Sequence, residues 1–177
     1  MKINPNPMRL ATQLYDDTPR VVLQSVVGAK QRLLAQIRYN RLVDCFLGAT
    51  AYSLGVWSGK VGRELMEIDE VYVAVDKHGR QFIVPVQAKG GKDQHGIVQT
   101  AQDIAWCQTN LPELICRPIS VQFVTSTKIA MFALAICDGE IKVAEERHYE
   151  LVPAKSVTEE DLKNYSVAAM SESQTLP

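Results

Sequence analysis

The sequence predicts an α/β (α+β) fold in which helices flank a mixed central β-sheet. Two runs rich in β-branched and aromatic residues, 66–76 and 80–89, are separated only by Lys77-His78-Gly79. Apolar residues then recur at helical spacing through 94–109, and three further strand-like runs follow at 118–125, 129–137 and 141–153. Helices and strands therefore alternate along the chain, and no internal repeat divides it. We expect one domain over residues 1–177.

The N-terminal third is predicted to be irregular at first and then helical. Asn4-Pro5 and Asn6-Pro7 favour turns, so residues 1–17 are expected to form an irregular arm. Thr18-Pro19 reads as an N-cap and a first helical position, and apolar residues continue at near-helical spacing to Ile37. A break near Tyr39-Asn40 divides this region. Four glycines predict a loop over residues 48–63: Gly48, Gly55, Gly59 and Gly62.

The C-terminal part contains a hairpin signal and a short helix. Asp138-Gly139 joins the last two strand-like runs and favours a tight turn. Thr158 precedes three acidic residues, which suit the first turn of a helix. Residues 166–177 are expected to form a frayed tail.

Composition argues against a membrane or secreted protein. The chain has 177 residues, of which 46% are hydrophobic, and it contains neither an apolar run of about 20 residues nor an N-terminal secretory signal. The four cysteines form no CxxC motif and have no paired histidines, so we expect reduced, mostly buried thiols and not a zinc site or a disulfide framework. A cytoplasmic location without membrane contact is the expectation.

Charge is distributed unevenly along the chain. Residues 1–63 contain nine Lys and Arg against three Asp, a net of +6, so residues 64–177 carry the −7 that gives the overall −1. A basic N-terminal part can follow a phosphate backbone while an acidic remainder holds a cation. A solvated basic helix face explains the same asymmetry. The candidate nucleic-acid-binding residues are Lys30, Arg32, Arg38, Arg41 and Lys92.

The short turn at 77–79 fixes a register for the two central strands. If Asp76 pairs with Arg80, paired positions sum to 156, which places Asp69 opposite Gln87 and Glu67 opposite Lys89. Side chains alternate along a strand, so all four are expected on one face of the sheet. A slip of one residue would separate them.

Cleavage of a phosphodiester by a divalent ion needs oxygen ligands beside the phosphate and a cation or base near the attacking water. Asp69 supplies a negative ligand, Gln87 a neutral amide oxygen, and the Ala88 carbonyl a further oxygen. Lys89 can orient the water and stabilise developing negative charge. The alternative is an ordinary structural role, in which Asp69 caps a strand end, Gln87 satisfies a backbone group and Glu67 pairs with Lys89.

These residues resemble the motif of the PD-(D/E)xK nuclease superfamily. Glu67-Ile68-Asp69 is followed after about eighteen residues by Val86-Gln87-Ala88-Lys89, at the end of a hydrophobic strand. The resemblance implies a restriction endonuclease-like fold, catalytic Asp69, Gln87 and Lys89, and Mg²⁺ as the cofactor, with Mn²⁺ as a substitute. Members of the superfamily often have a polar residue on the next helix. Gln99 and Gln102 occupy that region.

Two departures from the motif bear on activity. Gln87 replaces the second acid, and there is no Glu before Glu64, so a metal ligand from the N-terminal helix would have to be replaced by Glu67 or by one of three glutamines: Gln24, Gln31 or Gln36. The resemblance implies an Mg-dependent endodeoxyribonuclease acting on double-stranded DNA in restriction or repair. A homodimer is expected if both strands are cut. The alternative is a non-catalytic nucleic-acid-binding or assembly module with the same fold.

Overall fold

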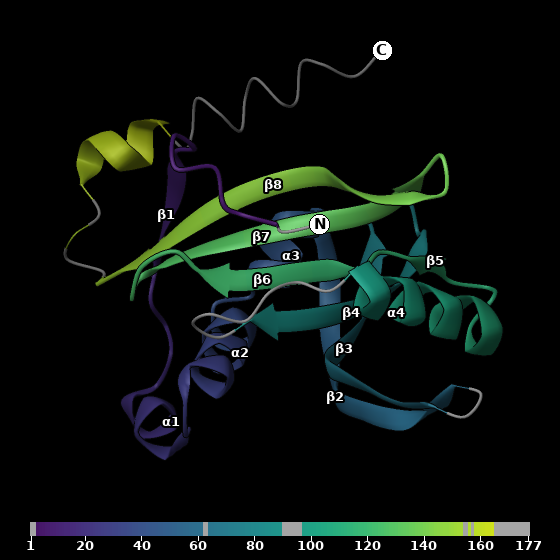
Figure 1. Ribbon diagram of the computed structural model, residues 1–177. Helices are drawn as coiled ribbons and strands as arrows, with labels where there is room; N and C mark the ends of the chain where they lie inside the picture. The colour runs from purple at the N-terminus through teal and green to yellow at the C-terminus, as the bar shows by residue number, and fades with distance from the viewer. Residues whose placement is uncertain (1–2, 62–63, 90–96, 154–155, 157, 165–177) are drawn as a thin grey trace, which may run out of the picture.

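The computed structural model describes residues 3–61, 64–89, 97–153, 156 and 158–164. Its centre is a mixed eight-stranded sheet, in which seven strands follow the order β1-β8-β7-β6-β4-β3-β2 and β5 pairs with β4 (Figure 1). Strand β4 is antiparallel to β3 but parallel to β6, and β1 is parallel to β8. The expected mixed α/β architecture is thus confirmed. The expected frayed tail lies outside the described residues.

The expected irregular arm is wrong for β1 (Ala11–Tyr15), which pairs with the end of β8 (Glu140–Val152). The edge of β8 provides backbone partners that no local pattern in residues 1–17 could predict.

The helical region that follows is divided in three. Helix α1 (Arg20–Ser25) is separated from α2 (Ala29–Tyr39) at Gly28, whose φ is 86°, and α3 (Leu42–Leu47) follows after a break at Asn40-Arg41. The predicted break near Tyr39-Asn40 is confirmed. After the additional break at Gly28, the first turn of α2 reaches Asp69 of the sheet through Lys30.

The expected loop over 48–63 is wrong, because most of it forms strand β2 (Ala49–Val61). This strand pairs with β3 (Glu64–Asp76) along nearly its whole length, with register shifts on both sides of Gly55. The glycines therefore mark a bulged strand and not a loop. Long antiparallel pairing with β3 outweighs the weak intrinsic preference of glycine for strands.

Strand β3 and strand β4 (Gln81–Lys89) form the hairpin that the sequence predicts. The amide of Asp76 donates to the carbonyl of Arg80 at 3.1 Å, and Gly79 has a φ of 76°. Paired residues sum to 156 from Val75↔Gln81 to Glu70↔Val86, so the predicted register is confirmed over this range.

The remaining elements also follow the predicted order. Helix α4 (Ile97–Asn110) leads through β5 (Ile115–Cys116) to β6 (Ile119–Phe123), β7 (Lys128–Cys137) and β8, and the turn between β7 and β8 lies at Asp138-Gly139. Residues 159–164 are helical, and the Thr158 hydroxyl accepts the amide of Asp161 at 3.2 Å. Among the elements after β4, only the two-residue strand β5 was not expected.

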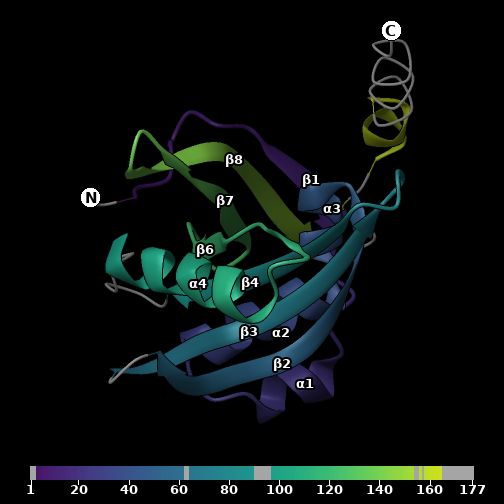
Figure 2. The same ribbon diagram turned by 90° about the vertical axis from the view of Figure 1, so that its right-hand side faces the viewer.

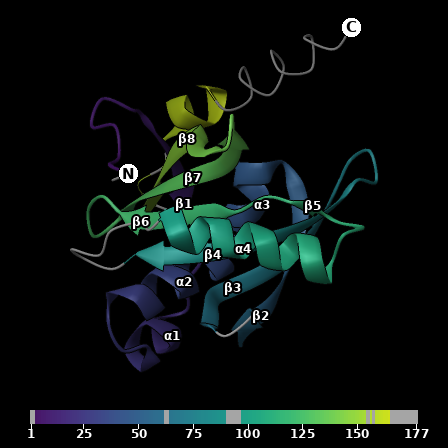
Figure 3. The same ribbon diagram turned by 45° about the vertical axis from the view of Figure 1, so that its right-hand side comes forward.

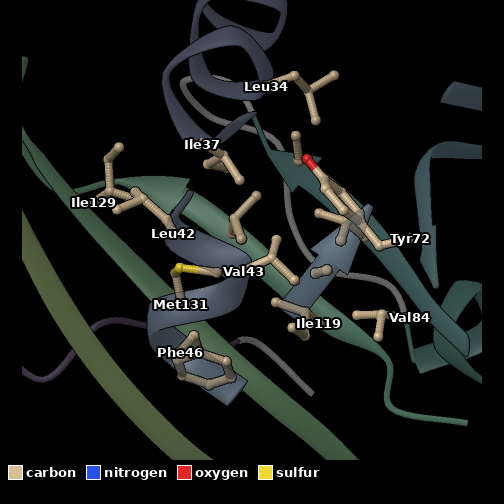
Figure 4. Close-up of a cluster of buried hydrophobic side chains, with 14 of the residues drawn as sticks. Leu34, Ile37, Leu42, Val43, Phe46, Tyr72, Val84, Ile119, Ile129 and Met131 are labelled. Carbon is tan, nitrogen blue, oxygen red and sulfur yellow. The ribbon is translucent and has the colours of Figure 1, made fainter. Parts of the chain in front are cut away.

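Helices cover both faces of the sheet. Helices α2 and α3 pack on one face through a core whose labelled residues in Figure 4 are Leu34, Ile37, Leu42, Val43, Phe46, Tyr72, Val84, Ile119, Ile129 and Met131. Helix α4 lies on the other face (Figure 2). There Trp106 packs against Trp57 of β2 with ring centroids 4.5 Å apart. Buried apolar contacts thus hold α2 and α4 on opposite faces of the sheet.

Two other expectations concern membranes and cysteines. None of the helices in the described residues is long and apolar enough to cross a membrane. All four cysteines are free thiols, as expected, but Cys45 and Cys137 are exposed, so the expectation of mostly buried thiols is wrong.

Candidate active site

The pairing of β3 with β4 ends at Glu70↔Val86, just before the predicted site residues. The β2 register shifts between Gly55 and Trp57, opposite Val71 and Ile68, so β3 is irregular at Asp69 and Glu70. The predicted pairs Asp69–Gln87 and Glu67–Lys89 are therefore absent from the ladder, because this irregularity changes which way the side chains of β3 point.

Asp69 lies where the two strands separate. Its Oδ2 accepts the backbone amide of Ala88 at 2.8 Å, which takes the place of a ladder hydrogen bond. Its Oδ1 is 2.5 Å from Nζ of Lys30 on α2. Asp69 is thus held between the edge of β4 and α2, and its side chain is only 4% exposed.

Gln87 instead contacts the helix on the opposite face. Its Nε2 lies 3.3 and 3.2 Å from the two carboxylate oxygens of Asp103 on α4, and 3.2 Å from the carbonyl oxygen of Glu67. Figure 3 shows α4 crossing in front of β4, with α2 behind it. The expectation that all four residues share one face is therefore wrong, since Asp69 contacts α2 while Gln87 contacts α4.

Asp103 is the residue that the sequence analysis missed. It is 1% exposed, and Gln99, one helical turn earlier, donates its Nε2 to Asp103 Oδ1 at 3.2 Å and to the Glu67 carbonyl at 3.3 Å. Two glutamines, one expected as a ligand and one as a supporting residue, thus hold the Asp103 carboxylate and a single β3 carbonyl. The spacing of four between Gln99 and Asp103 was the available signal.

The pKa of Asp103 depends on its burial, its hydrogen bonds and the charged residues around it. The pKa of Asp103 is raised to about 6, because burial raises it more than the hydrogen bonds from Gln99 and Gln87 lower it. The negative charge of Asp69 raises this pKa further, and the positive charge of Lys89 lowers it.

No family model, curated protein or solved structure matched this chain. The function proposed for this chain therefore rests on the geometry of the site.

The fit of a divalent metal was tested on these contacts. In the part of the chain that the structure describes, no three His, Cys, Asp or Glu side chains gather as a metal site. Asp69 and Asp103 are nevertheless both buried carboxylates, and the Lys30 ammonium already occupies a cation position on Asp69. Carboxylates and carbonyl oxygens are the ligands of Mg²⁺, so these residues fit such an ion.

The other expected ligands are placed less favourably. Glu67 has an exposed side chain, and it forms no ion pair with Lys89 in the described residues. Ala88 takes part through its amide, which donates to Asp69. Gln87 contributes its amide nitrogen, so the structural role considered for it, satisfying a backbone group, is also present at the Glu67 carbonyl.

Helix α2 brings a lysine to the site in place of a Glu or Gln. Gln36 is buried and donates Nε2 to Asp16 Oδ2 at 3.4 Å, away from Asp69, while Gln24 and Gln31 are exposed. The only contact from α2 to Asp69 in the described residues is that of Lys30. Gln102, the second supporting candidate on α4, is half-buried and has an interaction of its own.

The candidate nucleic-acid-binding residues fall into three groups. Arg38 binds the buried Glu70 through two hydrogen bonds of 2.8 Å, and Arg41 pairs with Asp44. Arg32 is exposed and lines a cavity of about 520 Å³ between the start of α2 and the end of β6. Lys92 lies outside the described residues. Lys30 is the candidate that contacts Asp69, and Arg32 lies on the same first turn of α2.

Proposed function

We propose that this chain is a divalent-metal-dependent endonuclease that hydrolyses phosphodiester bonds of DNA and has a restriction endonuclease-like fold. The observation that carries the proposal is the buried Asp69 carboxylate where β3 and β4 separate, with a second buried carboxylate, Asp103, bound to Gln87 of β4. Asp103 supplies the second carboxylate that Gln87 lacks. Mg²⁺ is the proposed cofactor, with Mn²⁺ as a substitute.

Each residue has a distinct task in this proposal. Asp69 and Asp103 hold the ion, which when bound acts as a Lewis acid on the scissile phosphate. Gln87 and Gln99 hold the Asp103 carboxylate in place through their amide nitrogens. Lys89, half-buried at the end of β4, orients the attacking water and stabilises negative charge that develops on the phosphate oxygens.

Substrate class follows from the basic residues beside the site. Lys30 and Arg32 lie on the first turn of α2, which reaches Asp69 through Lys30, and both can contact phosphates near the scissile bond. We propose double-stranded DNA as the substrate. Because each chain has one such site, cutting both strands favours a homodimer.

A second function is favoured by one observation. The Lys30 ammonium neutralises Asp69, the position at which a cleaving enzyme needs its ion. A permanent contact of this kind is what a non-catalytic nucleic-acid-binding or assembly module with the same fold would have. Metal binding separates the two candidates.

The deciding experiment is cleavage of supercoiled plasmid with Mg²⁺, with Mn²⁺ and with a chelator. We expect nicked or linear DNA only with metal, and loss of at least about 100-fold in rate for Asp69→Asn and for Asp103→Asn, since each removes a charged ligand. Asp138→Asn is the matched control, because Asp138 is 95% exposed in the β7–β8 turn. Full activity in either site variant, or no cleavage by the parent protein at any metal concentration, would contradict the proposal.

A further inference from the structure

Lys30 and Asp69 form an ion pair in which the two side chains differ in their exposure to solvent. The Lys30 Nζ lies 2.5 Å from Asp69 Oδ1, and the Lys30 side chain is 43% exposed while that of Asp69 is 4% exposed. The acid is therefore fixed inside the protein and the base reaches it from the surface. A lysine on a four-carbon stem can withdraw its ammonium into water without moving its backbone.

The backbone of Lys30 is held by the core. Lys30 lies in the first turn of α2, and the following turns of this helix bury Leu33, Leu34 and Ile37. These buried residues anchor α2 to the sheet, so the flexible side chain of Lys30 is the part that can leave Asp69. The Lys30 ammonium can therefore move only within the reach of its own side chain.

The Lys30 ammonium and a divalent ion would compete for one oxygen of Asp69, Oδ1. Oδ2 is occupied by the Ala88 amide, so Oδ1 is the oxygen that faces Lys30. A divalent ion that binds Asp69 through this oxygen has to displace the ammonium. The released Lys30 remains beside the site, where a substrate phosphate is the next available anion.

We propose that Lys30 occupies the cation position of Asp69 in the metal-free protein and moves to a substrate phosphate when a divalent ion binds. This inference rests on the proposed function for the identity of the site. Its consequence is that metal and nucleic acid bind cooperatively, since each stabilises the state in which Lys30 has left Asp69.

The test measures metal affinity without cleavage. Mn²⁺ binding to the full chain is titrated calorimetrically for the parent and for Lys30→Met, with Arg20→Met as the control, because Arg20 is an exposed cation at the start of α1. We expect Lys30→Met to lower the Kd for Mn²⁺ about fivefold, the order of a half-exposed ion pair, and Arg20→Met to leave it unchanged. Unchanged or weaker binding in Lys30→Met would overturn the inference.

A second measurement covers the risk that Lys30→Met destabilises the protein by leaving Asp69 unpaired. The rise in Tm on adding Mn²⁺ should be larger for Lys30→Met than for the parent, and Lys30→Arg should restore the parent value. DNA affinity should rise with Ca²⁺ in the parent and lose most of that rise in Lys30→Met. An equal rise in both would also overturn the inference.

The outcomes separate this inference from the proposed nuclease. If Lys30→Met binds Mn²⁺ more tightly while neither protein cuts plasmid, the competition is supported and the endonuclease proposal fails. If neither protein binds Mn²⁺, the competition is rejected. If the parent cuts plasmid and both proteins bind Mn²⁺ equally, only the inference about Lys30 fails.

Discussion

The amide of Gln87 on β4 lies within 3.3 Å of both carboxylate oxygens of Asp103 on α4. The residue that replaces the second acid of the nuclease motif therefore contacts a carboxylate on another element. This relationship changes what substitutions at the two positions should do.

The first prediction concerns the ionisation of Asp103. Its pKa is raised from 3.8 to about 6, so between these values the folded state retains a proton that the unfolded state has lost, and stability falls as pH rises. By pH 8 the cost to the metal-free protein is on the order of 3 kcal/mol. Asp103→Asn should remove this decline and be more stable than the parent at pH 8. Urea unfolding in the presence of chelator at pH 4, 6 and 8 measures it, and parallel curves for both proteins would contradict the assignment.

The second prediction concerns Gln87→Glu. If Gln87 were simply a metal ligand without the negative charge of the motif's carboxylate, Gln87→Glu would strengthen metal binding at no cost to the stability of the metal-free protein. Because its amide nitrogen contacts Asp103, a carboxylate there should repel Asp103 and lower the stability of the metal-free protein by about 2 kcal/mol. Mn²⁺ should reverse this loss and bind more tightly than in the parent. Thermal unfolding with and without Mn²⁺ decides it.

Gln99→Glu is the matched control for that experiment, because Gln99 also donates to Asp103 but is less buried. Its destabilisation should be smaller. An equally stable metal-free Gln87→Glu protein would show that the amide contact to Asp103 is unimportant.

The third prediction concerns Arg38, which was expected to contact phosphates. Glu70 is fully buried and bound by Arg38 and by the Ser53 hydroxyl, so Arg38→Ala should leave an unpaired buried carboxylate and cost about 2 kcal/mol. The double variant Arg38→Ala, Glu70→Gln should recover most of this stability. Chemical denaturation of the single and double variants tests the pair, and a stability loss below about 0.5 kcal/mol in Arg38→Ala would contradict it.

The fourth prediction concerns Arg32. As a phosphate contact, it should strengthen binding equally on all DNA sequences, and Arg32→Ala should reduce the slope of log Kd against log salt by about 1. Arg41→Ala is the control, because Arg41 pairs with Asp44 at the end of α2 remote from Lys30. Fluorescence anisotropy over a range of NaCl concentrations gives both slopes. Equal slopes for Arg32→Ala and the parent would exclude the contact.

Several features were predictable because they depend on neighbours in the sequence. The turn at 77–79 set the register of β3 and β4, and the Asp138-Gly139 turn set that of β7 and β8. A tight turn fixes the pairing of the residues next to it, so local information was sufficient there, up to Glu70↔Val86 in the first hairpin and up to the register shift at Ala133/Leu134 in the second. The glycine-rich segment 48–63 was misread for the opposite reason, since its strand structure comes from pairing with β3.

By itself, then, the sequence determined the central hairpin, the order of the main elements that follow it, and the region in which Asp69, Gln87 and Lys89 would lie. Tertiary structure alone decided that β3 becomes irregular at Asp69, that α2 brings Lys30 to that carboxylate, and that α4 brings Asp103 to Gln87. The physical reason is that hairpin register is set within a few residues, whereas the partner of a buried charge is chosen by how distant helices pack on the two faces of the sheet.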